Sequence, residues 1–234
     1  MKHLKEFETE AAFENAKSSL ESPCIALTED DTEIHIVYNE PLPFELVDLG
    51  LPSGTKWASC NLGAKTPYEY GDYYQWGSID PNTNTVCDWE HAPFNNSLDH
   101  YSSSYFEDNV SNWVDDNNVL KSEYDAAYKA TNGKAHIPTK AQWEELLANT
   151  TQEFIDEVEV TKFTASNGNS IFFPASGYRE NTDVSIAGSA HVWSSSLDPD
   201  SPEYAFHLYL SSSSCEMDNW YYRYNGMVVR PVSK

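Results

Sequence analysis

Positive charge is scarce in this sequence. It has 14 Lys and Arg residues against 37 Asp and Glu residues, which gives a formal net charge of −23 at pH 7. A field of this sign repels phosphate groups, so we expect no nucleic-acid partner and no docking on anionic lipid. Apolar runs long enough to span a bilayer are also lacking. The opening MKHLKEFETE is charged where a signal peptide needs an apolar segment, so no secretion signal is expected.

Cysteine is equally sparse, with only Cys24, Cys60, Cys87 and Cys215. None belongs to a CxxC pair, and the spacing indicates neither a zinc site nor a dense disulfide framework. We expect buried free thiols, with one disulfide as the alternative. His207 lies eight residues before Cys215 and could approach it from an adjacent strand, but no other residue supports a catalytic Cys–His dyad.

Other catalytic or metal-binding patterns are weak. His91, Asp99 and His100 could supply ligands to a cation, but their spacing matches no known site. Adjacent carboxylates are typical of a solvated surface in so acidic a chain, and the serines at 194–196 lack a GxSxG elbow. We therefore expect no catalytic residue, no cofactor and no metal site. Bound calcium remains an alternative because oxygen ligands are abundant.

Residues 1–42 indicate a small separate module. A helix is predicted within residues 1–22, with Thr9 as its N-cap and an apolar spacing formed by Phe7, Ala11, Ala12, Ala16 and Leu20. The segments CIAL and EIHIVY flank TEDDT and predict a hairpin. Since the module is too small for a full core, we expect it to attach to another structure or to form a homotrimer.

Residues 43–234 have a different pattern, in which short apolar runs alternate with Gly, Asn, Ser and Pro. Strands are predicted on both sides of a turn at 52–54, in GDYYQWGS and throughout residues 158–233. The polar segment 80–120 contains enough aromatic residues to predict a packed loop. A helix is predicted in IPTKAQWEELLANT, with Thr139 as its cap and an apolar stripe of Trp143, Leu146 and Leu147.

Six ordered motifs carry a family resemblance: VDLGLPSGTKWASCNLGA, PYEYGDYYQWG, HIPTKAQWEELL, NGNSIFFPASGYR, VWSSSL and NGMVVRPV. Together they resemble the Fibrobacter succinogenes major paralogous domain, which is similar to the formylglycine-generating-enzyme-like branch of the C-type-lectin fold. The resemblance covers residues 46 to 233 and implies an α+β domain with short irregular strands over one or two helices. The cysteine pair of the formylglycine-generating enzymes has no counterpart here, so the resemblance does not imply oxidase activity.

The C-terminal run from Tyr204 to Pro231 resembles the variable region of proteins diversified by retroelements, in which a reverse transcriptase rewrites adenine positions. Varied AAC and AAT codons reach Tyr, Ser, Asp, His and Asn but never Trp, Met or Glu. The resemblance thus implies fixed scaffold positions at Trp193, Glu203, Glu216, Met217 and Trp220. It implies variable, ligand-binding positions at Tyr204, His207, Tyr209, Ser211, Ser214, Asp218, Asn219, Tyr221, Tyr222 and Tyr224, with Asp198 as a further candidate.

This composition favours binding over catalysis. Tyr supplies rigid amphipathic contact area, while Ser and Asn supply adaptable hydrogen bonds. We interpret Arg223 and Arg230 as structural, the serines at 194–196 beside Trp193 as a hydrogen-bonded turn, and Gly226 as part of another turn. The expected function is that of a non-enzymatic receptor-binding protein of a Bacteroides phage tail, whose partners are a host-cell surface protein or glycan and a tail or fibre protein. The alternative is a bacterial surface or secreted adhesin with a fixed ligand.

Overall fold

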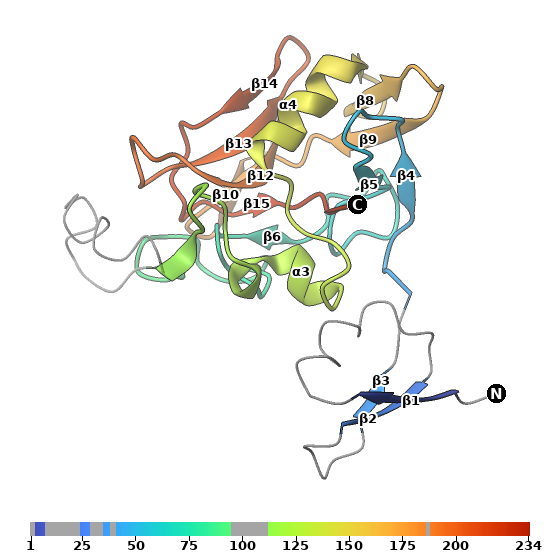
Figure 1. Cartoon of the computed structure of the whole chain (residues 1–234). Helices are drawn as coiled ribbons and strands as arrows, with labels where there is room; N and C mark the ends of the chain where they lie inside the picture. Colours follow the sequence, from blue (N-terminus) through green and yellow to red (C-terminus); the bar gives the residue numbers. More distant parts are fainter. Residues whose placement is uncertain (1–2, 8–23, 29–34, 38–40, 95–111, 186–187) are drawn as a thin grey trace. The chain divides into compact units, whose positions relative to one another are not determined.

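The computed structural model describes residues 3–7, 24–28, 35–37, 41–94, 112–185 and 188–234 (Figure 1). The chain divides into two compact units, Met1–Pro43 and Phe44–Lys234. The sequence-based boundary between residues 42 and 43 lies one residue before this division. Within the described residues, no helix combines the length and the apolar character needed to cross a membrane.

The N-terminal unit contains a three-stranded sheet in the order β1-β2-β3. Its strands are β1 (His3–Phe7), β2 (Cys24–Thr28) and β3 (His35–Val37). The predicted hairpin is confirmed, because β2 and β3 pair antiparallel. The helix predicted after Thr9 stays a prediction, and only Phe7 of its apolar residues is described. Phe7 lies in β1, which pairs in parallel with β2. Residues 8–23, including Thr9, lie outside the described residues.

The larger unit is mixed α+β, with strands predominating, and it is built on a five-stranded sheet in the order β14-β13-β12-β15-β6. β12 lies at its centre, pairing antiparallel with β13 and in parallel with β15. The strands are β6 (Tyr73–Tyr74), β12 (Ala190–Leu197), β13 (Ala205–Leu210), β14 (Cys215–Asp218) and β15 (Met227–Val228).

Three smaller sheets complete this unit, in the orders β16-β5-β4, β7-β8-β9 and β10-β11. Their strands are β4 (Leu46–Asp48), β5 (Lys56–Ala58), β7 (Thr150–Ile155), β8 (Val160–Ala165), β9 (Ser170–Pro174), β10 (Tyr178–Glu180), β11 (Asp183–Ser185) and β16 (Val232–Ser233). The predicted strands on both sides of the turn at 52–54 and in GDYYQWGS are therefore confirmed as β4, β5 and β6. The described helical segments are η2 (Ser122–Tyr124), α3 (Ala126–Ala130) and α4 (Lys140–Asn149).

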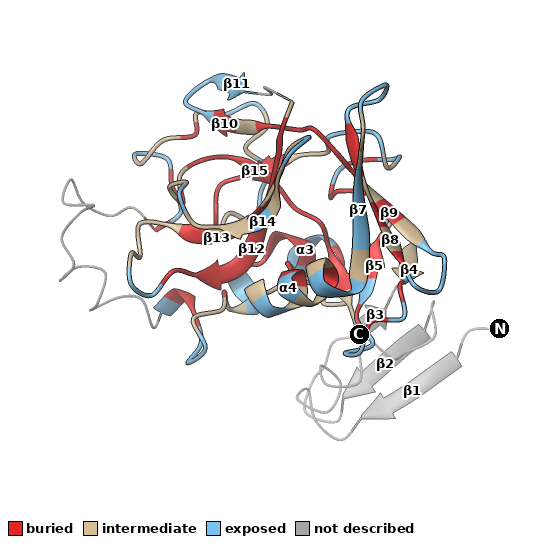
Figure 2. Ribbon diagram, turned by 90° about the horizontal axis from the view of Figure 1, so that it is seen from above, coloured by how far each residue is buried: buried red, intermediate tan, exposed pale blue. Residues whose placement is uncertain are grey.

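The predicted capped helix is confirmed as α4. Thr139 and Gln142 form a capping box, in which each side chain accepts a hydrogen bond from the other residue's backbone N–H. Trp143 and Leu146 are fully buried, and the ring of Trp143 lies 4.6 Å from that of Trp57. The helix packs on the face of the central sheet that carries Leu208 and Leu210 (Figures 1 and 2). Burial of this apolar stripe stabilises the helix more than its intrinsic propensity does.

Two local interpretations need correction. The serines at 194–196 do not form a turn but continue β12, because the strand stays paired across a register irregularity between Trp193 and Leu197. Gly226 is required by close approach and not by a turn conformation. A Cβ there would lie 2.9 Å from Cys87 Sγ and 3.0 Å from Arg179 Cβ, so a larger residue would push β15 and β10 apart.

Buried arginines act as internal ties, as expected from the sequence. Arg230 is fully buried, donates to Asn61 Oδ1 and to the carbonyls of Ala58 and Phe172, and stacks on Phe173 at 4.2 Å. These bonds connect β5, β9 and the C-terminal segment. Since every bond ends on a backbone or amide oxygen, this side chain is structural.

Candidate ligand-binding surface

The two faces of β13 and β14 differ in chemistry. Because alternate strand residues point to opposite faces, Leu208 and Leu210 enter the core while His207 and Tyr209 point the other way. The register pairs Tyr209 with Glu216 and His207 with Asp218. The predicted C-terminal binding residues of these two strands therefore share the face opposite α4.

On this face five rings form a histidine cluster, which consists of Tyr178, His191, His207, Tyr209 and Tyr221. His191 is at its centre, with ring centroids 4.7 Å from Tyr221, 5.1 Å from Tyr209 and 5.3 Å from His207. Tyr221 also contacts Tyr178 at 4.5 Å. Tyr209 and Tyr221 are half-buried, so these two predicted positions present part of each ring to solvent above the imidazoles.

His207 is fully buried, and neither ring nitrogen has a hydrogen-bond partner among the described residues. A direct contact between this residue and a ligand, as expected from the sequence, does not fit that position. Burial lowers the pKa of His207 to about 3 and that of His191 to about 4, so both rings are neutral at pH 7. The histidines therefore support the tyrosine rings from below.

A second group of rings, which we name the tyrosine ladder, consists of Tyr204, Tyr222 and Tyr224 with Trp89. Tyr222 stacks on Tyr204 at 4.8 Å and on Tyr224 at 5.2 Å, and Trp89 contacts Tyr222 and Tyr224 edge-on. A bridge between Tyr204 and Tyr222 fixes the backbone. The ladder brings three predicted ligand-binding positions together, and stacked rings lose little entropy when they bind.

Arg223 lies between Tyr222 and Tyr224 in the sequence, but its side chain is buried. Its Nε donates to the carbonyl of Pro202 at 2.6 Å, and its guanidinium lies 5.5 Å from the ring of Trp89 and 5.8 Å from that of Trp113. Burial lowers its pKa to about 10, so it stays charged at pH 7. The interpretation of Arg223 as a structural residue agrees with this geometry. The contacts of Trp89 and Trp113 with Arg223 also show that these two parts of the segment 80–120 are packed.

Trp220 is the most exposed large apolar residue of those described, with 80% of its surface accessible. Its expected role as a scaffold residue therefore needs correction: it has no core contact to make, in contrast to Trp193 and Met217. Glu216 is also exposed. An exposed Trp beside half-buried tyrosines is typical of a residue that contacts a partner.

The remaining predicted positions have mainly local hydrogen bonds. Ser211 and Ser214 form the turn between β13 and β14, where Ser214 N donates to Ser211 Oγ at 3.0 Å. Asn219 N donates to Asp218 Oδ1 at 2.7 Å, and its side chain donates to Asp198 Oδ2 at 2.6 Å. Asp198 is buried, so this candidate is not a surface position. These hydrogen bonds fix the local conformation of the surface and add little to its aromatic contact area.

A Cys–His dyad is incompatible with the strand register. Cys215 pairs with Leu210 and packs against the core, whereas His207 lies on the opposite face of the same sheet. Burial raises the pKa of the Cys215 thiol to about 12, which suppresses the thiolate. Cys60, Cys87 and Cys215 are free thiols, as expected, while the side chain of Cys24 lies outside the described residues.

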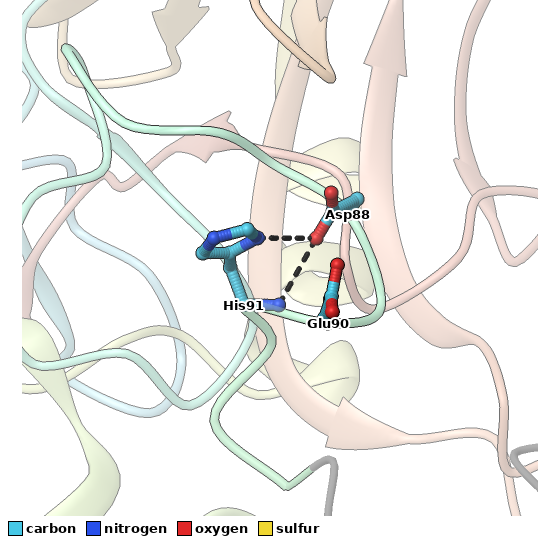
Figure 3. Close-up of side chains that lie close together, drawn as sticks. All are labelled: Asp88, Glu90 and His91. Carbon is cyan, nitrogen blue, oxygen red and sulfur yellow. Dashed lines mark hydrogen bonds and ion pairs between the residues drawn. The ribbon is translucent and has the colours of Figure 1, made fainter. Parts of the chain in front are cut away.

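One acidic cluster lies beside Trp89 (Figure 3). His91 Nδ1 is 2.7 Å from Asp88 Oδ1, and Glu90 brings a third possible ligand atom close to both. The hydrogen bond that the His91 ring donates to the Asp88 carboxylate raises the pKa of His91. Of the cation ligands considered from the sequence, Asp99 and His100 lie outside the described residues. Asp88 already accepts hydrogen bonds from the backbone and the ring of His91, and surface carboxylates such as Glu90 do not by themselves define a metal centre.

Sequence reasoning missed three rings that complete this surface. Tyr178, His191 and Trp89 come from β10, β12 and the segment after residue 80. Only the alternation of His191 with buried Val192 could have placed it on the outer face. No family model, curated protein or solved structure matches the chain.

Proposed function

We propose that the larger unit is a C-type-lectin-like domain and that the protein is a non-enzymatic binder of a host-cell surface protein or glycan. The observation that carries this proposal is that Trp220, Tyr221 and the three tyrosines of the ladder, all between residues 204 and 224, are partly or largely exposed. Aromatic side chains held by neighbouring rings lose little freedom on binding. The polar residues between them supply hydrogen bonds without requiring a metal.

The specific form of the proposal is a retroelement-diversified receptor-binding protein of a Bacteroides phage tail, located in the virion. Tyr209 and Tyr222 support it, because Asn codons can reach them and both are half-exposed, whereas Met217, which Asn codons cannot reach, packs on the core. The buried His207 and the exposed Trp220 depart from this pattern. The N-terminal unit then serves to attach the protein to a tail or fibre protein or to hold a homotrimer.

Binding is tested with fluorescently labelled protein on a panel of Bacteroides strains, measured by flow cytometry. The double variant Tyr221→Ala/Tyr222→Ala should lose cell binding with little change in melting temperature, because both rings are half-exposed. Tyr68→Ala is the matched control, since Tyr68 is an exposed tyrosine on another part of the unit, beside Phe172. Loss of folding together with binding in the double variant would contradict a contact role.

Diversification is tested separately by deep sequencing of the 3′ end of the gene in cultures and related isolates. The proposal expects substitutions at adenine-derived codons for positions such as Tyr204 and Tyr222, and none at Trp193, Met217 or Trp220. An invariant region would overturn diversification and favour a fixed adhesin of the same fold, for which a glycan array is the next measurement.

A further inference from the structure

A pocket of about 760 Å³ lies at the N-terminal end of α4. Its walls come from residues 115–119, the first turn of α4, residues 196–200 and Phe206. Backbone bonds fix these segments together: Lys140 N donates to Ser196 Oγ at 3.0 Å, and Leu197 N donates to the carbonyl of Asn118 at 2.8 Å. A cavity of this size, built on a helix and a central strand, falls within the range of ligand pockets.

The lining combines apolar side chains with an excess of negative charge. It includes one basic residue, Lys140, and four acidic residues, Asp115, Glu144, Asp198 and Asp200. Apolar lining residues are Val119, Leu197, Pro199 and Phe206. Apolar side chains together with carboxylates suit a ligand with an aliphatic stem and a positively charged end.

Asp198 provides an independent indication of a cationic ligand. Only 5% of its surface is accessible, and it accepts hydrogen bonds from Asp200 N and from Asn219 Nδ2. In the part of the chain that the structure describes, no ion pair joins Asp198 to a basic side chain. A buried carboxylate without a counter-charge is costly, and an incoming cation would remove that cost.

Lys140 shows that this pocket accepts an ammonium group. Its Nζ lies 4.2 Å from the ring centroid of Phe206 and 3.6 Å from Glu144 Oε1. A ring face and a carboxylate are the two groups that favour a cation at short range. Lys140 pairs with Glu144, and no described basic side chain forms an ion pair with Asp198 or Asp200.

An anion or a metal ion fits the pocket less well. Two of the first backbone donors of α4 are already used, since Lys140 N donates to Ser196 Oγ and Gln142 N donates to Thr139 Oγ1. Among the described residues, the pocket carboxylates do not bring three ligand atoms within 4.8 Å of one another, whereas the group at Asp88 does. They are thus too widely spaced to surround one ion, but an extended cation can reach two of them.

We propose that this pocket binds a basic side chain, lysine or arginine, of a protein partner. The stem of the side chain lies over Leu197 and Phe206, and its charged end contacts Asp198 and Asp200. The proposal goes beyond the function assigned to the aromatic surface and uses different residues. The two regions are connected because Asn219 holds the Asp198 carboxylate.

The test is an NMR titration of the full chain with N-acetyl-lysine methylamide and N-acetyl-arginine methylamide. Both probes should shift the amide signals of Leu197, Asp198 and Phe206, and the neutral norleucine analogue should not. Asp198→Asn and the exposed Asp200→Asn should each weaken binding, with an expected loss of about tenfold for Asp198→Asn because its charge is buried. Glu157→Gln, an exposed residue outside the pocket, is the matched control for lost charge.

A variant with the opposite expected sign sharpens the test. Lys140→Ala removes the competing ammonium and should strengthen binding of both probes. Lys129→Ala, which removes an exposed lysine of α3, should not change binding. Equal shifts with the norleucine analogue, or unchanged affinity in both Asp198→Asn and Asp200→Asn, would overturn the proposal. Loss of cell binding in the Tyr221/Tyr222 variant does not alter this outcome, so the two proposals fail separately.

Discussion

The two faces of the central sheet are built from the same strands but serve different purposes. On the side of α4, β12 and β13 contribute Val192, Leu208 and Leu210, which are buried and apolar. On the other side the same strands contribute His191, His207 and Tyr209, whose rings contact one another. The face toward α4 is filled by apolar side chains, whereas the other contains buried imidazoles in contact with partly exposed tyrosine rings.

The face packed against α4 therefore serves mainly stability, and the opposite face serves the proposed recognition. The apolar face stabilises through area removed from water and through close packing, so its residues cannot change size freely. The outer face is supported by ring contacts that tolerate other polar or aromatic residues. A binding surface can therefore vary on one side of a strand while the neighbouring residue on that strand holds the fold.

The largest expected effect concerns Leu208, which is fully buried. Leu208→Ala should lower the free energy of unfolding by about 2–5 kcal/mol, because it removes buried methyl groups and leaves a cavity. Tyr209→Ala, its immediate neighbour on the outer face, should cost about 1 kcal/mol. Urea unfolding followed by tryptophan fluorescence measures both, since all 7 Trp residues belong to the larger unit. A larger loss of unfolding free energy in Tyr209→Ala than in Leu208→Ala would contradict the assignment of stability to the face packed against α4.

A second prediction concerns the buried imidazoles. The pKa of His207, about 3, lies below the unfolded value near 6.5, so the unfolded state binds more protons between these values. Stability should therefore be complete above about pH 6.5 and should decline as the pH falls, with each such histidine contributing up to about 1.4 kcal/mol per pH unit. The measurement is the free energy of unfolding at about pH 7, 6 and 5, a range that includes the pKa of histidine in the unfolded chain.

His207→Phe removes one of the two titrating rings and should make this decline less steep. His91→Gln is the control, because Asp88 raises the pKa of His91 and the sign of its contribution is opposite. An identical pH slope in wild type and His207→Phe would show that the His207 imidazole is not buried in its neutral form. His191→Phe should flatten the decline in the same sense, since burial lowers the pKa of His191 to about 4.

The parts of the fold that could be predicted are those with local sequence signals. The Thr139 cap, Gln142 and the Trp143 stripe define α4 within a few residues, and the turn at 52–54 defines β4 and β5. The strand β1 was not predicted, because its pairing with β2 joins residues far apart in the sequence. Local propensity contains no information on that partner.

The candidate site shows the same limit. Residue types between 204 and 224 indicated a binding surface, but which side chains face outward depends on the register of β13 with β12 and β14. This register places His207 beside His191 on the face opposite α4, and the rings of Tyr178 and His191 from other strands contact Tyr221 there. The pocket beside α4 was also missed, because Asp115, Lys140 and Asp198 meet there from three separate segments.

The smallest expected effect on stability concerns Trp220. Since 80% of its surface is accessible, Trp220→Ala should change the free energy of unfolding by no more than about 0.5 kcal/mol. It should nevertheless reduce binding of the labelled protein to Bacteroides cells, whereas Trp220→Phe, which keeps a flat ring, should retain part of it. Unchanged cell binding in Trp220→Ala would restrict the contact surface to the tyrosine ladder and Tyr221. A large loss of stability would place the indole in a packed environment and remove the contrast between the two faces at this strand end.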